Sequence, residues 1–353
     1  MTGLLEHAEQ TSSAMRRPRI TVWALLVLGV LLIVLLGLRV GEAESIGWLN
    51  NVLLIGCSLL IEAVPFLLLG AAVAAAIEVY VPERWFLRFG RVPRGVQMVA
   101  ASFGGFLFPV CECGSVPVAR RLLANGLTPG AALAFMLAAP VVNPVVILST
   151  WFAFRGQPQE MFVVVGRIAL GIAVALIVGA LLAKRFGRMA AAQQLAQDPR
   201  ARRAEVDGSV RAAESRRSRS FRYFVQLGSE FFSMFKFMLI GATIAAVIQT
   251  FVAQDIMSTV SSATLLAIPA MMLFAYLLSL CSESDAILIA SFTQFSPVAQ
   301  LAFLVFGPML DLKLTTLYIG AFGTRMARAL ALTITIVVLV LCLWVEAIWG
   351  LLR

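Results

Sequence analysis

Three cysteines stand at interruptions of the hydrophobic pattern, where a thiol can meet a ligand. Cys111 and Cys113 lie in the run 108–117, which contains two prolines and a glycine, and Cys281 lies in a second polar interruption at 279–285. Soft metals and metalloids prefer thiolate ligands. We therefore predict that Cys111, Cys113 and Cys281 bind a soft solute, with Cys111 and Cys113 as candidate metal ligands. The alternative is that they are buried packing residues, as free cysteines commonly are.

The other two cysteines and the single histidine limit the other kinds of site that the chain could form. Cys57 and Cys342 lie in uninterrupted apolar segments and are interpreted as packing residues. Three convergent thiols could hold a trigonal soft centre, but they lack the histidines and the fourth thiolate of a structural zinc site. The single histidine, His7, lies in a polar N-terminal tail, which excludes a metal site built from histidines and a histidine-dependent triad. A membrane thiol–disulfide protein stays open as an alternative.

Ionisable and amide side chains in the same apolar segments form the second group of candidates. They are Glu112, Glu283, Asp285, Asp311, Lys313 and Asn143. A charge at membrane depth costs several kcal/mol and marks a functional site by default. We expect Asn143 and Asp311 to contact the substrate, and the other four to bind a coupling ion or to pair charges.

Two simpler roles stay open for this group. Asn143 could form a hydrogen bond at a helix break beside Pro144, and Asp311 with Lys313 could be a structural ion pair. Because helix residues two positions apart do not face each other, we expect Asp311 and Lys313 each to meet another partner.

The composition places these residues in a membrane. The chain has 353 residues, of which 60% are apolar and 13% charged, and its mean hydropathy is +0.92. Soluble proteins carry about 25% charged residues. The fold predicted is an all-α polytopic membrane protein. Phosphate-binding and nucleophile-elbow glycine motifs are absent, so we expect no ATP hydrolysis by this chain. We expect a protein that is not an enzyme and has no resident cofactor.

Nine apolar segments are long enough to enter a bilayer. They are 20–38, 50–77, 96–123, 129–154, 161–183, 224–252, 264–292, 297–322 and 329–350. Proline, glycine and polar residues break two of them, 96–123 and 264–292. If both broken segments return to the side from which they entered, 22 Lys and Arg residues lie inside and three outside. If both cross, the numbers become 10 and 15. The positive-inside rule favours seven spanning helices and two re-entrant hairpins.

The two halves of the chain resemble each other, which predicts an internal repeat. An odd number of crossings in each unit would insert the second unit inverted, as in many secondary transporters. Matching positions lie 168 to 171 residues apart: 66–71 with 237–242, Cys111 with Cys281, 133–135 with 301–303, Pro140 with Pro308, and Asn143 with Asp311.

The predicted organisation has five parts. They are a cytoplasmic N-terminal tail (1–19), a peripheral helix and loop (20–47), a first repeat (48–186), a basic cytoplasmic linker (187–222) and a second repeat (223–353). Eleven Lys and Arg residues against four Asp and Glu residues lie between Lys184 and Arg222. Because this segment joins two membrane regions and has few aromatic residues, we expect the positive-inside rule rather than nucleic-acid binding to explain it.

Two motifs carry a family resemblance. They are Phe108-Pro109-Val110-Cys111-Glu112-Cys113-Gly114-Ser115-Val116-Pro117-Val118 and, further along the chain, Pro140-Val141-Val142-Asn143-Pro144. The chain resembles the predicted permease family that includes the ArsP-type organoarsenical efflux permeases, from about residue 50 to residue 350. The resemblance implies a bacterial inner-membrane permease. It also implies that trivalent organoarsenicals bind through thiols, here Cys111, Cys113 and Cys281, and that some members work beside a second small membrane subunit.

Three functions therefore compete. The leading hypothesis is a secondary transporter that exports a soft, thiol-reactive solute such as an arsenical or a metal ion through a midplane site. The alternatives are a thiol–disulfide redox protein and a membrane subunit of a two-component permease complex.

Overall fold

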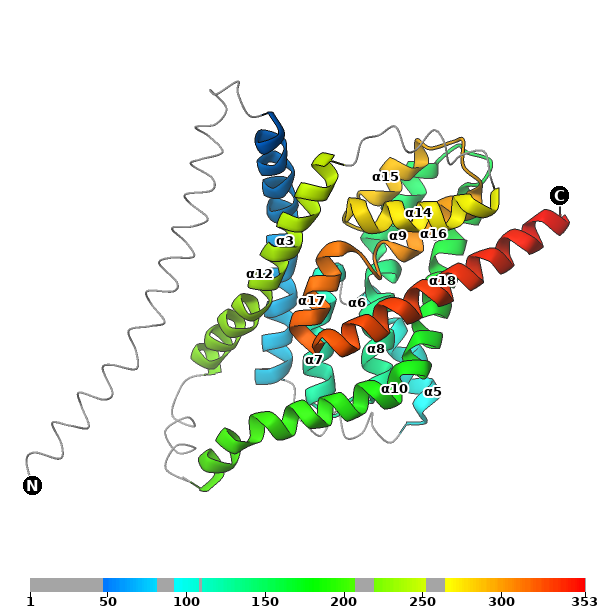
Figure 1. Cartoon of the computed structure of the whole chain (residues 1–353). Coiled ribbons are helices and arrows are strands. Elements are labelled where there is room, and N and C mark those ends of the chain that lie inside the picture. The colour runs from blue at the N-terminus through cyan, green and yellow to red at the C-terminus, as the bar shows by residue number, and fades with distance from the viewer. Residues whose placement is uncertain (1–46, 81–91, 108–109, 207–218, 252–263, 353) are drawn as a thin grey trace, which may run out of the picture. The chain divides into compact units, whose positions relative to one another are not determined.

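The computed structural model describes residues 47–80, 92–107, 110–206, 219–251 and 264–352 (Figure 1), and within these ranges it is helical without any strand. The predicted N-terminal tail and the predicted helix at 20–38 lie outside the described residues. The chain divides into two units, Met1–Ser58 and Leu59–Arg353. Everything that follows concerns the second unit, apart from the first residues of α3.

The first half of the chain contributes α3 to α10 and the second half α12 to α18. The helices are α3 (Gly47–Tyr80), α5 (Arg94–Ser102), α6 (Gly104–Leu107), α7 (Glu112–Ala124), α8 (Pro129–Val142), α9 (Pro144–Phe154), α10 (Glu160–Val206), α12 (Arg219–Phe251), α14 (Thr264–Leu278), α15 (Asp285–Ala290), α16 (Pro297–Phe306), α17 (Leu312–Phe322) and α18 (Thr324–Leu352).

Five stretches of the described chain are long and apolar enough to cross a membrane. They are Asn50–Tyr80, Pro129–Phe154, Glu160–Gly187, Ser220–Thr250 and Thr324–Ile348. Five of the seven predicted crossings coincide with them, so the chain is a multi-pass membrane protein. The predicted crossing at 297–322 is divided between α16 and α17, each shorter than the roughly 20 residues that a spanning helix needs. The number of crossings therefore stays a prediction.

Both predicted interruptions are present. The first separates α6 from α7, and the second separates α14 from α15. Two further breaks are present. Asn143 separates α8 from α9, where the sequence left a helix break beside Pro144 open, and 307–311 separates α16 from α17, which was not predicted. At the first of these, Pro144 disfavours helical geometry in the preceding residue, and Asn143 accordingly has ψ of 128°.

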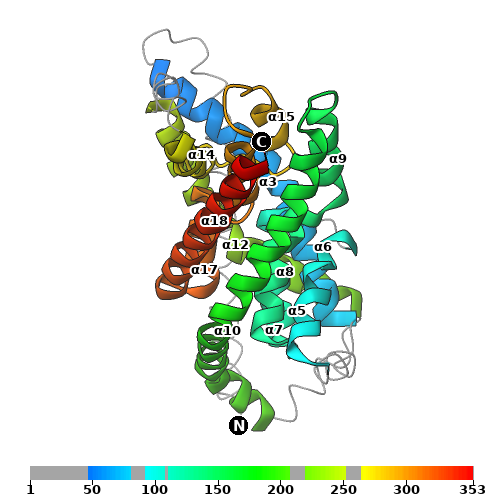
Figure 2. The same cartoon turned by 90° about the vertical axis from the view of Figure 1, so that its right-hand side faces the viewer.

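Two short helices form the buried centre of the second unit. Every residue of α8 from Gly130 to Val142 is buried, and so is every residue of α16 from Val298 to Phe306. Helices α5, α6, α7 and α10 pack around α8, whereas α14, α15, α18 and α10 pack around α16 (Figures 1 and 2). Both arms of each broken segment therefore rest on one central helix.

Contacts between the halves follow a crossed pattern. Helix α7 of the first half packs against α17 of the second, and α15 of the second half packs against α9 of the first. In addition, α10 packs against α18. The N-termini of α7 and α15, which follow the two predicted interruptions, are therefore each held by the opposite half.

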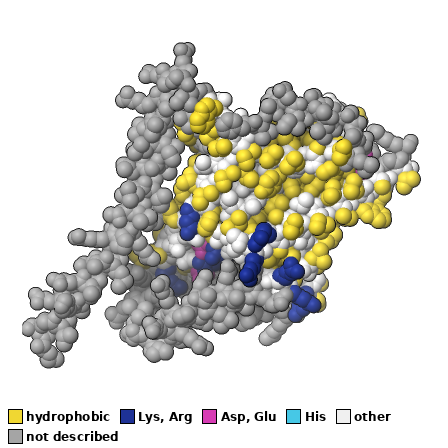
Figure 3. Space-filling view, in the orientation of Figure 1, with side chains coloured by type: hydrophobic (Ala, Val, Ile, Leu, Met, Phe, Trp, Pro, Cys, Tyr) yellow, Lys and Arg dark blue, Asp and Glu magenta, His cyan; other side chains and the backbone are white. Residues whose placement is uncertain are grey.

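Helix α18 carries large apolar side chains on its buried face and on its exposed face. Leu330, Ile334, Val338 and Cys342 repeat every four residues and are buried. A second set of large apolar residues on the same helix is exposed: Leu332, Ile336, Val340, Trp344 and Ile348. A helix that is apolar on all sides is typical of a membrane span with one face towards lipid. On the face of the molecule shown in Figure 3, hydrophobic side chains cover much of the described part of the surface.

The predicted basic linker is partly helical. Helix α10 continues past its apolar part to Val206, and α12 begins at Arg219. Residues 207–218 lie outside the described ranges, so the side of the membrane on which this segment lies remains a prediction.

Candidate functional site

The first interruption places two thiols at the start of a helix. Cys111 is extended and precedes α7, and its carbonyl accepts the N–H groups of Gly114 and Ser115 at 3.1 and 3.0 Å. Cys113 lies in the first turn of the helix. Gly114 allows a close approach of α3, because a Cβ on Gly70 would overlap the backbone of Gly114.

The second interruption repeats this local geometry. The carbonyl of Cys281 accepts the N–H groups of Ser284 and Asp285, both at 3.0 Å. These are the third and fourth residues after the cysteine, as at Cys111. Ser279 closes the preceding helix in the left-handed region, with φ of 47°, and its hydroxyl accepts the N–H of Leu312 at 3.1 Å.

The two interruptions meet. The hydroxyl of Ser282 donates a hydrogen bond to Glu112 Oε2 at 3.1 Å, across 170 positions of sequence. The Cys111, Cys113 and Cys281 thiols lie close enough to interact electrostatically with one another. The exposed fractions of Cys111, Cys113 and Cys281 are 1, 2 and 3%. In this conformation the thiols are closed to solvent.

Arg167 of α10 fixes the second interruption in place. Its guanidinium donates to both oxygens of Asp285 at 3.1 Å, to the carbonyl of Ser282 at 3.0 Å and to Thr150 Oγ1 at 2.7 Å. The side chains of Arg167 and Asp285 are 2 and 3% exposed. A buried charge is tolerated only when it is paired and hydrogen-bonded, so this network ties α10, α9 and α15 together around Ser282.

Asp311 and Lys313 lie near the thiols. Asp311 precedes α17 in extended geometry, and its Oδ1 accepts the N–H of Leu314 at 2.6 Å. Its Oδ2 lies 3.8 Å from Lys313 Nζ. The expectation that these two residues meet only other partners was wrong, because Asp311 lies outside the helix and its carboxylate can turn towards Lys313. Lys313 also interacts electrostatically with Cys113 and Cys281.

Asn143 occupies the corresponding place in the first half. Its Oδ1 accepts the N–H of Val145 at 3.0 Å and caps α9. Asn143 and Asp311, which match in the sequence repeat, therefore do the same local work at the start of matching helices. This is the helix-break hydrogen bond that the sequence left open for Asn143.

We call the residues around the meeting point, all buried except the partly exposed Glu283, the central cluster. It consists of Cys111, Glu112, Cys113, Arg167, Cys281, Ser282, Glu283, Asp285, Asp311 and Lys313. Four carboxyl groups thus face two cations. Three carboxyl oxygens have no hydrogen-bond partner among the described residues: Glu112 Oε1, Glu283 Oε2 and Asp311 Oδ2. The cluster therefore has spare acceptors for a proton, a cation or a cargo group.

The arrangement of possible metal ligands is a separate question from the spare acceptors. Within the part of the chain that the structure describes, no group of three or more His, Cys, Asp or Glu residues is arranged to hold a metal ion. The five cysteines are free. The pair of thiols at Cys111 and Cys113, rather than a closed trigonal centre, is the soft-ligand feature of this conformation.

The sequence did not identify three members of the networks. Arg167, Thr150 and Ser282 each hold two elements together. Arg167 is an isolated charge in an otherwise uncharged apolar run, and this signal alone could have marked it as a partner for one of the buried carboxylates.

Comparison with known proteins agrees with the helical membrane architecture. The model of the ArsP_1 family, described as a predicted permease, matches residues 48–347. The chain belongs to this permease family. Membership points to a transporter rather than an enzyme.

Two relatives cover most of the chain. It is 36% identical to the UPF0718 protein YcgR of Bacillus subtilis (strain 168) over 269 residues, which are 76% of this chain and 87% of the relative. It is 30% identical, over 76% of its length and 86% of the relative, to a Streptococcus mutans serotype c protein named as a subunit of a two-component membrane permease complex. No solved structure matches.

Proposed function

We propose that this permease exports a soft, thiol-reactive solute, such as a trivalent organoarsenical or a metal ion, which binds to Cys111 and Cys113 in the central cluster. The observation that carries the proposal is the hydrogen bond between Ser282 and Glu112, which joins the two interruptions beside three buried thiols. Irregular backbone at membrane depth is tolerated where it is buried in protein or lines a cavity, and transporters place substrate sites there.

The transport mechanism that we propose is alternating access between inverted repeats, with seven crossings and two re-entrant hairpins. Three observations support the repeat. The carbonyls of Cys111 and Cys281 each accept the N–H groups of the third and fourth residues that follow, Asn143 and Asp311 cap α9 and α17, and the α7–α17 contact has its counterpart in α15–α9. In this scheme the units are 48–186 and 223–353, and the N-terminus and the basic linker lie in the cytoplasm.

The binding step needs no redox partner. Each thiol that attacks a trivalent arsenic centre replaces one hydroxide, the thiol proton combines with that hydroxide, and one water molecule leaves. Cys111 and Cys113 together would replace two hydroxides, and the reverse hydrolysis would release the cargo. In the proposed site, Asn143, Cys281 and Asp311 contribute further contacts, and Glu112, Glu283, Asp285 and Lys313 contribute coupling or charge pairing.

Transport into everted membrane vesicles tests the proposal. Cys111→Ser and Cys113→Ser should each lower the uptake of a trivalent organoarsenical at least tenfold, because one of two sulfur ligands is lost. Cys342→Ser is the matched control, since Cys342 is free and equally buried (1% exposed) but lies in α18, outside the cluster. Unchanged uptake of every thiophilic cargo in the Cys111 and Cys113 variants would refute a thiol-bound cargo.

A second candidate is a membrane subunit of a two-component complex, and the relative from Streptococcus mutans favours it. Purification of the tagged full chain from its native membrane should then yield a stoichiometric second membrane protein, and the chain alone should not transport. A disulfide between Cys111 and Cys113 trapped during turnover would instead favour the redox alternative.

A further inference from the structure

We infer that an anionic phospholipid binds in the groove between the start of α8, the start of α5 and the middle of α10, with its phosphate held between Arg94 and Lys184. The groove has a volume of about 590 Å³ and is lined by Arg94, Met98, Thr128, Pro129, Gly130, Ala183, Lys184 and Gly187. It lies apart from the central cluster and shares no residue with it.

The ends of the spanning helices place the groove at headgroup level. The candidate span Pro129–Phe154 begins with a lining residue, and the candidate span Glu160–Gly187 ends with one. Where two spans end at the same place, the hydrocarbon gives way to the polar headgroups. On the face of the molecule shown in Figure 3, Lys and Arg side chains gather along the lower border of the hydrophobic surface.

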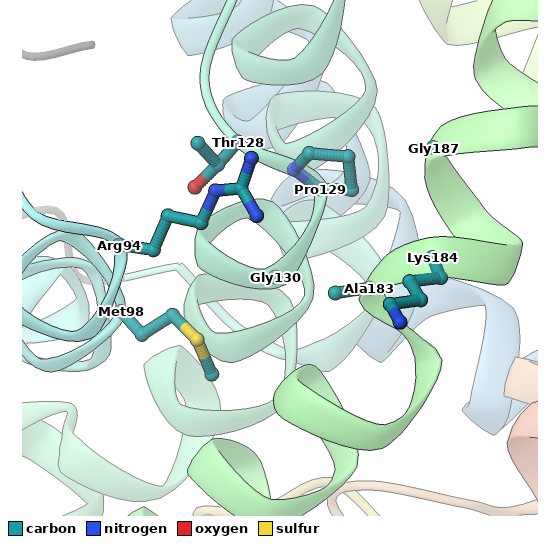
Figure 4. Close-up of a pocket in the computed structure, with 8 residues that line it drawn as sticks. All are labelled: Arg94, Met98, Thr128, Pro129, Gly130, Ala183, Lys184 and Gly187. Carbon is teal, nitrogen blue, oxygen red and sulfur yellow. The ribbon is translucent and has the colours of Figure 1, made fainter. Parts of the chain in front are cut away.

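The charges in the groove fit a phosphate. Arg94 reaches in from α5 towards Thr128 and Pro129, and Lys184 enters from α10 on the opposite side (Figure 4). Both cations are exposed, and no carboxylate among the described residues forms an ion pair with either of them. Guanidinium and ammonium groups on two sides of a groove match a phosphodiester, which offers several acceptor oxygens.

The start of α8 adds a third favourable element. Thr128 precedes the helix, but its side chain accepts no cap hydrogen bond from it. Its hydroxyl donates to Gln97 Oε1 at 2.7 Å. Gln97 is itself held through its amide N–H to the carbonyl of Val92 at 2.8 Å. The positive end of the α8 dipole therefore faces the groove without a side-chain acceptor, which favours an anion there.

The rest of the lining fits the apolar part of a lipid. Glycines let the helices pack closely around the groove: a Cβ on Gly130 would lie 3.1 Å from Met98 Sδ, and one on Gly187 would lie 3.0 Å from Pro129 Cγ. A free phosphate ion gains nothing from Met98, Pro129 and Ala183, whereas the glycerol and upper acyl carbons of a lipid do. We therefore assign the groove to the lipid rather than to a soluble anion.

Native mass spectrometry of the purified, delipidated full chain, titrated with phosphatidylglycerol, tests the assignment. Wild type should bind phosphatidylglycerol at least tenfold more tightly than phosphatidylcholine with the same acyl chains. The double variant Arg94→Gln/Lys184→Gln should bind phosphatidylglycerol about thirtyfold more weakly, at the usual weight of two basic residues near an anionic lipid. Both side chains are exposed, so the fold should survive, and the thermal midpoint verifies that.

The matched control is Arg325→Gln/Arg328→Gln. It removes two exposed cations at the start of α18 and should change affinity less than threefold. Ala183→Phe keeps every charge but narrows the groove, and it should also weaken lipid binding. Three results would overturn the inference: wild-type affinity in Arg94→Gln/Lys184→Gln, an equal loss in the control, or displacement of the lipid by inorganic phosphate, which would assign the groove to a free anion.

Discussion

Replacing Arg167 with methionine should be among the most destabilising single changes in the described part of the chain. Methionine keeps much of the apolar volume but removes the guanidinium, and with it two bonds to Asp285, one to the carbonyl of Ser282 and one to Thr150. An uncompensated charge is left on a carboxylate that is 3% exposed. Breaking a buried ion pair in this way costs about 3–5 kcal/mol.

A double-mutant cycle separates the ion pair from the other bonds. Asp285→Asn alone leaves Arg167 with its bonds to Ser282 and Thr150 and should cost about 3 kcal/mol. Arg167→Met/Asp285→Asn removes both charges, so its cost should fall short of the sum of the single changes by about 2–3 kcal/mol. It should still exceed zero, because two acceptors have lost a charged donor at about 1.5 kcal/mol each.

The free energy of unfolding can be measured for the full chain in mixed micelles of mild detergent and SDS. Lys236→Met is the control, since Lys236 is an exposed cation in the apolar helix α12 and its ammonium lies 5.0 Å from the Phe237 ring. Its removal should cost about 0.5–1 kcal/mol. Additive single effects, or a cost for Arg167→Met no larger than that of Lys236→Met, would show that the buried network does not hold the second interruption.

The same measurement addresses two backbone features. Gly70→Ala should cost about 1–3 kcal/mol, because the new methyl group overlaps the backbone of α7 at Gly114 and a packed interior tolerates no overlap; Gly95→Ala, where a Cβ meets nothing within 4 Å, should be neutral or slightly stabilising. Asn143→Ala should cost about 1 kcal/mol through loss of the α9 cap, whereas Asn143→Asp should stay within about 0.5 kcal/mol, since Asp311 caps α17 in the same way. Equal losses in Asn143→Ala and Asn143→Asp would contradict the capping role.

The sequence predicted the interruptions because their causes are local. Proline and glycine between 108 and 117 cannot continue a helix, and the polar run at 279–285 has no apolar face to bury. The further break at Asn143 has an equally local cause in Pro144, and the sequence left it open as one role of Asn143, although the apolar run from 129 to 154 is continuous. Hydropathy measures whether a segment can enter the bilayer, and it does not register whether the helix stays continuous.

The partners within the central cluster could not be predicted, because their causes are not local. Ser282 meets Glu112 across 170 positions, and Arg167 meets Asp285 across 118. The sequence shows that a buried cation such as Arg167 needs an anionic partner. It does not show which of the several buried carboxylates is that partner. Packing of α10 beside α16 and of α15 beside α9 decides between them.

Two contacts hold the central cluster closed: the Arg167–Asp285 ion pair and the Ser282–Glu112 hydrogen bond. They differ in strength, and this difference indicates where the cluster opens. Arg167 binds Asp285 through a charged, forked pair and also holds the carbonyl of Ser282. Ser282 is joined to Glu112 by one hydrogen bond from a neutral donor, and a hydrogen bond to a charged group contributes about 1.5–3 kcal/mol, less than a buried ion pair costs to break. The second interruption, α9 and α10 should therefore move as one body. We expect separation from α7 to break the Ser282–Glu112 hydrogen bond and to expose Cys111 and Cys113, which is the motion that the proposed cargo site would require.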